Sequence, residues 1–108
     1  MKRVTASSEA MIRHTVVYSL KHAAGSVEEI AFLQAIKELA RIPTVKNFEC
    51  YRQISKKNNY RFGVAMDFDG TEGYEAYNKH PDHVRFVEMR WKPEVTDFME
   101  IDYAPLDR

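Results

Sequence analysis

Bulky side chains alternate strictly with small or charged ones between residues 60 and 69, and this pattern constrains the fold more than any other. The bulky positions are Tyr60, Phe62, Val64, Met66 and Phe68. The residues between them are Arg61, Gly63, Ala65, Asp67 and Asp69. Because successive side chains of a strand point to opposite faces, the pattern predicts a strand with one bulky face and one small or charged face.

Turn and capping residues divide the rest of the chain into five more elements. Ser26 followed by Glu29 forms a capping box, which predicts a helix start, and Pro43 predicts the end of that helix. Pro81 suits the first turn of a helix and breaks the one before it. The expected order is a strand over 11–20, a helix over 26–42, strands over 45–54 and 60–69, a helix over 71–91 broken at 81, and a strand over 95–103. This order predicts an α+β fold, the ferredoxin-like split βαβ, with an antiparallel sheet and its helices on one face.

The sheet face without helices is expected to carry apolar side chains. The apolar residues on the minor faces of their strands are Met11, Val17, Val45, Tyr51 and Phe98. Apolar groups on an uncovered sheet indicate an association surface, and a symmetric dimer covers such a surface. The sequence therefore predicts a homodimer through the open sheet face.

Composition excludes several classes of partner. The 16 Lys and Arg balance the 16 Asp and Glu of the 108 residues, so no net field attracts nucleic acid or an anionic membrane. The lone Cys50, expected as buried packing, excludes an internal disulfide and favours a reducing, cytoplasmic location. No apolar run reaches the ~20 residues that cross a bilayer. We expect residues 1–10 to be a flexible polar tail and residues 11–108 to be one domain.

The segment from Tyr77 to His83 concentrates the acid and base groups of the chain, with two of its four histidines. His83 shares a helix face with Phe86 and Val87, so burial should lower its pKa. A lowered pKa keeps the imidazole neutral near pH 7, the state of a general base. The alternative is a helix-start histidine whose ring is hydrogen-bonded to a backbone carbonyl.

Two further candidates each have a structural alternative. Tyr77 could donate its hydroxyl to an enolate oxygen, whereas Tyr74 and Tyr77, three residues apart, also fit an aromatic pair in the core. We expect Tyr77 in a pocket and Tyr74 in the core. His14 shares a strand face with Ile12 and Val16, where a lone histidine is more often a core residue than a catalyst. Only proximity to His83 would give His14 a functional role.

A metal site is not expected in this segment. His80 and His83 are three residues apart, but Pro81 places them on either side of a helix boundary. No acidic residue or cysteine stands at a convincing ligand spacing from them. The sequence predicts no metal and no cofactor.

The chain resembles the stress-responsive dimeric α/β-barrel (Dabb) family. The resemblance rests on the element order, on the opening strand of residues 12–17, and above all on Tyr77 followed by His-Pro-Asp-His-Val at 80–84. It covers residues 11–103. It implies a dimer whose two sheets face each other as a barrel, with a small-molecule pocket between sheet and helices in each subunit.

A plant polyketide cyclase related to this family forms olivetolic acid by aldol condensation, and its catalytic tyrosine and histidine match Tyr77 and His83. Its pocket histidine on the first strand matches His14. Its pocket histidine on the third strand falls where this chain has Phe62, so the resemblance does not extend to a shared polyketide substrate. The resemblance implies that Tyr77 and His83 are catalytic. His14, His80 and Phe62 are the candidate substrate-binding residues.

Three functions fit the sequence. The first is an enzyme that binds a small carbonyl compound and catalyses enolisation, cyclisation or an aldol-type reaction, with His83 as base and Tyr77 stabilising the enolate. The second is a non-catalytic dimeric stress-related protein or ligand carrier, which predicts no cavity for a ligand of ~300 Å³. The third is an oxygen-using monooxygenase, which no residue of this chain requires.

Overall fold

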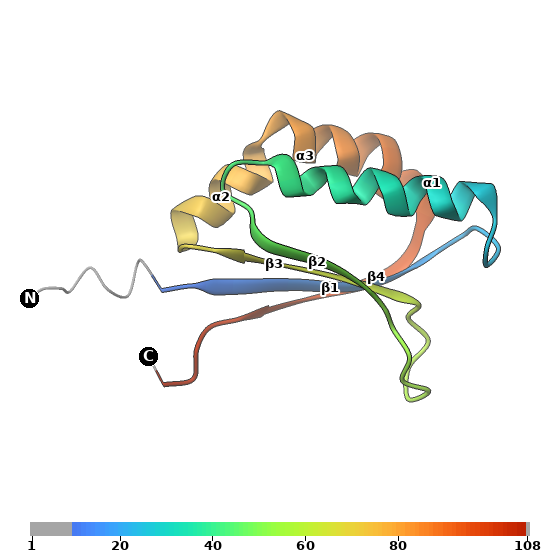
Figure 1. Ribbon diagram of the computed structural model, residues 1–108, viewed down its shortest axis with the longest axis horizontal. Coiled ribbons are helices and arrows are strands. Elements are labelled where there is room, and N and C mark those ends of the chain that lie inside the picture. The colour runs from blue at the N-terminus through green and yellow to red at the C-terminus, as the bar shows by residue number, and fades with distance from the viewer. Residues whose placement is uncertain (1–9, 108) are drawn as a thin grey trace, which may run out of the picture.

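A computed structural model describes residues 10–107, so all but the last residue of the expected tail at 1–10 lies outside the described part of the chain. Four strands form one antiparallel sheet in the order β2-β3-β1-β4, and the helices cover one face of it (Figure 1). The elements are β1 Ile12–Leu20, α1 Val27–Ile36, η2 Lys37–Arg41, β2 Lys46–Arg52, β3 Phe62–Phe68, α2 Thr71–Lys79, α3 Pro81–Phe86, η3 Val87–Trp91, α4 Lys92–Glu94 and β4 Val95–Tyr103. The predicted ferredoxin-like α+β fold is confirmed.

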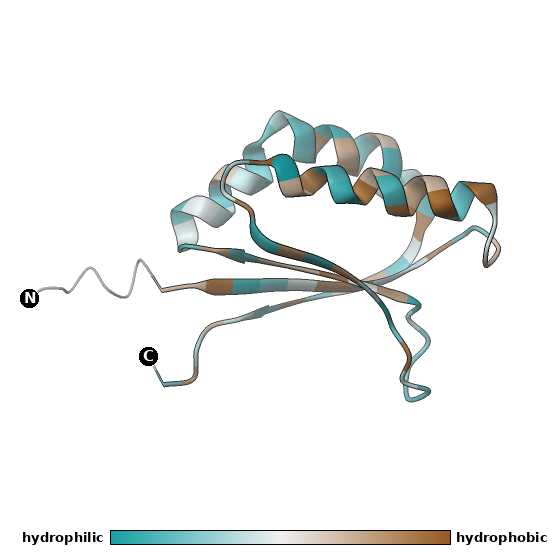
Figure 2. Ribbon diagram, in the orientation of Figure 1, coloured by the Kyte–Doolittle hydropathy of each residue, from teal (hydrophilic) through white to brown (hydrophobic). Residues whose placement is uncertain are grey.

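The strand predicted from the alternating pattern is β3, and all seven of its residues are buried. It lies inside the sheet between β1 and β2, with Val64 opposite Val16 of β1. The bulky face of β3 packs toward the helices, where the aromatic core lies. In that core the rings of Tyr18 and Phe32 are fully buried, with centroids 5.8 Å apart. Hydrophobic and hydrophilic residues alternate along α1 because only one side of this helix meets the core (Figure 2).

Helix α1 begins at the predicted capping box. The hydroxyl of Ser26 accepts a hydrogen bond from the backbone N–H of Glu29 at 3.1 Å. The carboxylate of Glu29 accepts from the backbone N–H of Gly25 at 2.9 Å rather than from that of Ser26. Gly25 has a φ of 78°, which glycine adopts without strain. The helix tightens into the 3₁₀ helix η2 after Ile36, so the predicted helix up to Pro43 exists in two parts.

The predicted break at Pro81 separates α2 from α3. His80 ends α2 and caps α3, because its Nδ1 accepts a hydrogen bond from the backbone N–H of Asp82 at 3.1 Å. Pro81 occupies the first position of α3, where no backbone donor is needed. Gly70 is the N-cap residue of α2, so no side chain caps this helix. After α3 the chain widens into the π-helical turn η3, which ends at Trp91.

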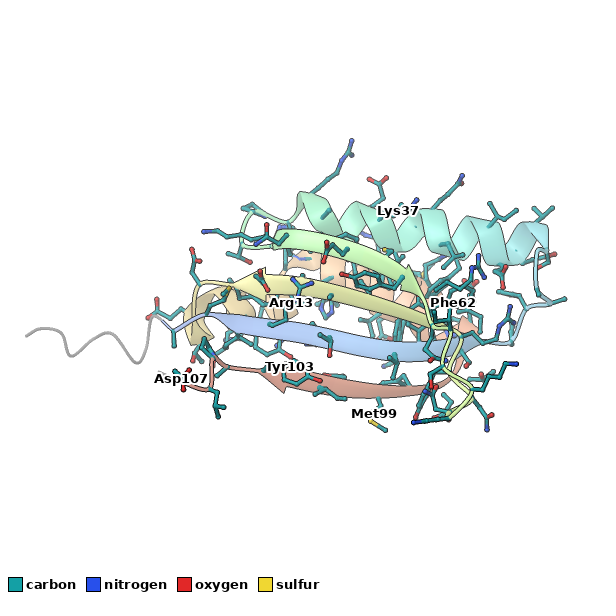
Figure 3. All side chains as sticks on the ribbon, turned by 60° about the horizontal axis from the view of Figure 1, so that its bottom comes forward. Arg13, Lys37, Phe62, Met99, Tyr103 and Asp107 are labelled. Carbon is teal, nitrogen blue, oxygen red and sulfur yellow. The ribbon has the colours of Figure 1, made fainter. Side chains whose placement is uncertain are left out.

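Two predicted face assignments are wrong. Phe98 lies opposite Tyr18 in the register of β1 and β4, so its ring faces the helices and meets Trp91 edge-on at 5.5 Å. Val45 also packs against the core rather than lying on the open face. The apolar residues of β4 that do lie on the open face are Met99, Ile101 and Tyr103 (Figure 3).

The burial predicted for Cys50 is also wrong. Its thiol belongs to β2, which is an edge strand of the sheet, and the residue is exposed. Its register partner Val64 is buried because that residue lies on the inner strand β3. The alternation of apolar residues in β2 reports the two faces of the strand but not its position at the edge.

Candidate active site

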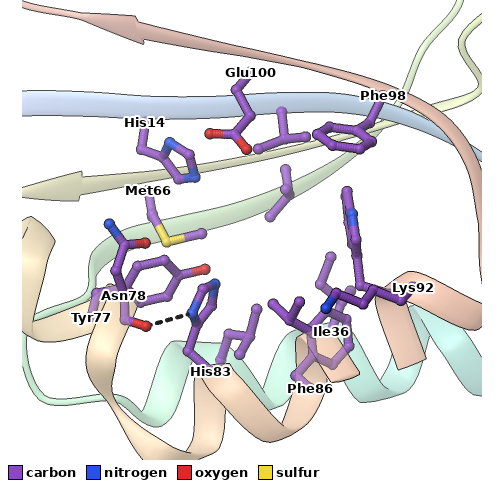
Figure 4. Close-up of a pocket in the computed structure, with 15 residues that line it drawn as sticks. His14, Ile36, Met66, Tyr77, Asn78, His83, Phe86, Lys92, Phe98 and Glu100 are labelled. Atoms are coloured by element: carbon purple, nitrogen blue, oxygen red, sulfur yellow. Dashed lines mark hydrogen bonds between the residues drawn. The ribbon is translucent and has the colours of Figure 1, made fainter. Parts of the chain in front are cut away.

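A cavity of about 430 Å³ lies between the sheet and the helices α2, α3 and η3 (Figure 4). Its polar lining residues are His14, Tyr77, Asn78, His83, Lys92 and Glu100. Its apolar lining residues are Val16, Ile36, Leu39, Val64, Met66, Phe86, Val87, Trp91 and Phe98. The cavity therefore brings together three of the residues singled out from the sequence, which are His14, Tyr77 and His83.

Tyr77 and His83 lie side by side at one wall of the cavity, with ring centroids 4.2 Å apart. Tyr77 comes from the last turns of α2 and His83 from the first turn of α3, so the break at Pro81 folds one ring against the other. Tyr77 is 3 % exposed, and burial raises the pKa of its phenol. No other described residue accepts a hydrogen bond from this hydroxyl, which therefore keeps its proton and remains available as a donor.

The orientation of His83 is fixed by one backbone hydrogen bond. Its Nδ1 donates to the carbonyl oxygen of Asn78 at 3.2 Å (Figure 4). The proton is therefore on Nδ1, and the lone pair is on Nε2, which lies on the cavity side of the ring. Burial lowers the pKa of His83, which the bond to Asn78 partly offsets and the nearby His14 reinforces. The hydrogen bond to a backbone carbonyl, which was the structural alternative for His83, is thus present. It leaves the unprotonated Nε2 facing the cavity.

His14 is held by two groups that no sequence motif links to it, which are Asp102 and Tyr74. The Nδ1 of His14 lies 2.6 Å from a carboxylate oxygen of Asp102 and 2.9 Å from the hydroxyl of Tyr74. The Tyr74 hydroxyl donates to the other oxygen of Asp102 at 2.9 Å. The ring of Tyr74 stacks on that of Phe68, with centroids 5.0 Å apart. Tyr74 therefore combines the expected packing with a polar contact.

In the sequence, Asp102 and Glu100 are two positions apart, which places both side chains on the same face of β4. Asp102 lies opposite His14 in the register of β1 and β4, and Glu100 lies opposite Val16. Paired residues of neighbouring strands share a face, so the two acidic residues point toward the helices. This pairing depends on the register between two strands far apart in sequence, which the sequence pattern does not specify.

Two of the candidate substrate-binding residues do not line this cavity. Phe62 is 2 % exposed and packs against Tyr18 at 5.7 Å, so it belongs to the aromatic core. His80 is half-buried, and its ring caps α3. Asn78, Lys92 and Glu100 line the cavity instead, although no motif in the sequence marked them.

The described part of the chain holds no group of three or more His, Cys, Asp or Glu side chains that could bind a metal ion. The titratable groups that line the cavity are those of His14, Tyr77, His83, Lys92 and Glu100. Tyr74 and Asp102 contact His14. Over residues 10–107 no helix is long and apolar enough to cross a membrane. The chemistry that these groups support directly is proton transfer and hydrogen bonding to a developing oxyanion.

Fold and site together define a ferredoxin-like α+β domain with a cavity between sheet and helices and a tyrosine and two histidines on its wall. Residues 12–105 match the sequence profile of the Stress responsive A/B Barrel Domain. The chain belongs to this family, Dabb. A search of curated protein sequences finds no match.

Three solved structures illustrate the range of similar proteins. A Dabb family protein with a ferredoxin-like fold from Mesorhizobium loti is 56% identical, with a TM-score of 0.88, over 90% of this chain and 98% of that one. A dimeric ferredoxin-like protein of unknown function from Thermobifida fusca is 28% identical, with a TM-score of 0.74, over 89% and 92%. The hydroxynitrile lyase of Passiflora edulis is 12% identical, with a TM-score of 0.79, over 93% and 97%. At that identity the likeness concerns the fold alone.

Proposed function

We propose that this protein binds a small carbonyl compound in the cavity and catalyses acid–base chemistry on it, of the enolisation, cyclisation or aldol type. The observation that carries the proposal is the placement of the Tyr77 phenol against the His83 imidazole on the wall of one cavity. The pair offers a neutral base and a protonated donor side by side. The base removes the proton, and the donor stabilises the negative charge of the enolate oxygen.

In the proposed reaction, Nε2 of His83 takes a proton from the carbon next to the carbonyl group. The electron pair of that C–H bond forms the enolate double bond, and the carbonyl π pair moves to the oxygen. The Tyr77 hydroxyl donates a hydrogen bond to this oxygen. Because the phenol is buried, its donated hydrogen bond acts in a medium of low dielectric constant, where it stabilises negative charge more strongly than in water.

The distribution of polar and apolar lining residues indicates which kind of ligand the cavity fits. The polar groups His14, Tyr77 and His83 lie at one part of the cavity, and Phe98 lies at the far end (Figure 4). The ring of Trp91 meets that of Phe98 edge-on. A ligand with a carbonyl head and an aromatic or aliphatic body fits this division, because each part then meets groups of its own polarity. We propose such a compound as the substrate class.

Proton exchange measures this function without knowledge of the natural substrate. Cyclohexyl methyl ketone carries exchangeable methyl protons and an apolar ring, and mass spectrometry in deuterium oxide follows the exchange. We expect the protein to accelerate exchange, and His83→Gln and Tyr77→Phe to slow it by about a hundredfold each. Tyr60→Phe and His22→Gln are matched controls outside the cavity. Exchange at the rate of buffer alone, or equal loss in the controls, would reject the proposal.

The alternative is a non-catalytic dimeric stress-related protein or ligand carrier. That function predicts an interior without space for a ligand of ~300 Å³ if assembly is its sole role. A cavity of about 430 Å³ supports ligand binding over pure assembly. A carrier would bind the ketone and leave its protons unexchanged, so the same experiment separates the two functions.

We also propose that the open face of the sheet forms a homodimer interface. The apolar part of this face consists of Val17, Met99 and Ile101 with Tyr51 and Tyr103 (Figure 3). Beside it, Arg13 is paired with Glu49 at 2.7 Å and with Asp67 at 3.0 Å. Exposed apolar surface flanked by paired charges suits a self-complementary contact. The dimeric protein of Thermobifida fusca, 28% identical, supports this proposal.

We further propose a cytoplasmic location. The single cysteine is exposed and unpaired, and such a thiol is stable in a reducing compartment. Immunofluorescence or cell fractionation tests this location directly.

A further inference from the structure

The two histidines of the cavity are held in different ways, although both present Nε2 to the same space. His83 is fixed by a neutral backbone carbonyl, whereas His14 is fixed by the carboxylate of Asp102 at 2.6 Å. A carboxylate at that distance stabilises positive charge on an imidazole, and a carbonyl does so much less. Opposite environments of this kind separate an acid from a base.

Hydrogen bonding also fixes which nitrogen of His14 carries its first proton. The Tyr74 hydroxyl gives its own proton to Asp102, so toward His14 its oxygen is an acceptor. Asp102 is an acceptor as well. Both partners of Nδ1 therefore require a proton on that atom, and any change of charge on the ring takes place at Nε2.

We propose that His14 is the catalytic acid of this site, and that Asp102 and Tyr74 are positioning residues that hold its ring as a proton donor opposite the base His83. This inference rests on the proposed function and assigns it a second proton transfer. It narrows the substrate to a compound with two carbonyl groups, or to a pair of carbonyl compounds, because the second carbonyl oxygen needs a proton when it is attacked.

The proton balance of the reaction closes within the site. The enolate carbon formed by His83 attacks the second carbonyl carbon, and a carbon–carbon bond forms. The π pair of that carbonyl moves to its oxygen, which takes the proton from Nε2 of His14. His14 is left neutral and His83 protonated, and one proton returned through water restores the starting state. No oxidant, reductant or leaving group is needed.

The titratable groups around His14, taken from every element packed against it, are consistent with an acid at this position. Tyr77 lies between the two imidazoles, with its ring centroid 6.2 Å from that of His14 and 4.2 Å from that of His83. Positive charge on His14 lowers the pKa of His83, so the acid helps to keep the base neutral. The titratable groups facing His14 are Asp102 and Glu100 of β4, Tyr74 and Tyr77 of α2, and His83 of α3. Its neighbours on β3, Met66 and Phe68, are uncharged.

The test compares two reactions of one ketone. Deuterium exchange into cyclohexyl methyl ketone needs only the base and Tyr77, whereas addition of that ketone to benzaldehyde also needs the acid. We expect His14→Gln to lower the ratio of the addition rate to the exchange rate by at least about twentyfold. Equal losses in both reactions, or no loss in addition, would overturn the inference. If the unaltered protein does not accelerate deuterium exchange, the proposed function itself is rejected.

The positioning role has its own signature, which does not depend on turnover. Nitrogen NMR of the full chain should show the first proton of His14 on Nδ1, and Asp102→Asn should move the ring nitrogen resonances of His14. The addition rate should fall in that variant and recover in Asp102→Glu. Asp97→Asn, on the open face of the same strand, is the matched control. Unchanged His14 resonances in Asp102→Asn would overturn the inference even if no ketone reacts.

Discussion

The phenol ring of Tyr77 lies 4.2 Å from the imidazole of His83, although Pro81 separates them into different helices. The backbone turns at His80, whose extended conformation ends α2 and caps α3. This turn brings two side chains six positions apart to one cavity wall. A continuous helix would place residues six positions apart on different faces, so the proline break creates the pair.

Removal of the Tyr77 hydroxyl should leave the fold intact. Tyr77→Phe keeps the ring contacts with Phe68 and His83, and no described residue hydrogen-bonds to the hydroxyl. We expect the free energy of unfolding to change by no more than about 1 kcal/mol. Denaturant titration measures it. A loss above about 3 kcal/mol would show that the hydroxyl is structural and not poised for a ligand.

Protonation of His83 should destabilise the folded chain. Burial lowers the pKa of His83 below its ordinary value of 6.5, so the unfolded chain binds this proton more tightly. The stabilising contribution is complete above 6.5 and is lost as the pH falls through 6.5 toward the lower pKa of the folded state. Denaturant titrations at about pH 7.5 and about pH 5.5 should show a smaller stability loss in His83→Gln than in the unaltered chain. An equal loss in both would contradict the burial of a neutral ring.

The open sheet face should lose its partner when a charge is placed in it. Ile101→Lys puts an ammonium group among the apolar residues of β4, where a dimer would bury it without a partner. Light scattering at micromolar concentration should give a dimer mass for the unaltered protein and a monomer mass for this variant. Ile30→Lys is the matched control, because Ile30 is an exposed isoleucine of α1 on the opposite layer. A monomer mass for the unaltered protein would reject the interface.

Ligand entry into the cavity should change the emission of Trp91. This residue is the single tryptophan of the chain, and it lines the cavity beside Phe98. Cyclohexyl methyl ketone should shift its fluorescence in a saturable way. Val87→Phe adds bulk to the lining and should weaken binding by at least about tenfold, whereas Val84→Phe, an exposed site on α3, should not. A linear, unsaturable response in all three proteins would show that the cavity does not bind the ketone.

Local pattern alone predicted the fold. The alternation in β3, the capping box at Ser26 and the break at Pro81 are local signals, and each leads to the structure observed. The shared cavity of Tyr77 and His83 could be inferred from the motif and the family resemblance.

Features that depend on pairing between distant strands could not be predicted. Phe98 and Asp102 of β4 face the helices because of their register with β1, which includes a shift at Ser19 and Leu20. The apolar face of β4 looks like a core face in sequence, yet it lies on the open side of the sheet. Cys50 is exposed for a related reason, because a strand pattern does not reveal which strands lie at the edge.

The joint action of Tyr77 and His83 on one bound ketone is the central claim, and a double-mutant cycle tests it most directly. Deuterium exchange into cyclohexyl methyl ketone is measured for the unaltered protein, for Tyr77→Phe, for His83→Gln and for the protein with both changes. Residues that act as a unit give strongly non-additive effects, so the double variant should be no slower than the slower single variant, within about threefold. Single effects that multiply in the double variant, or exchange that neither change affects, would contradict the account.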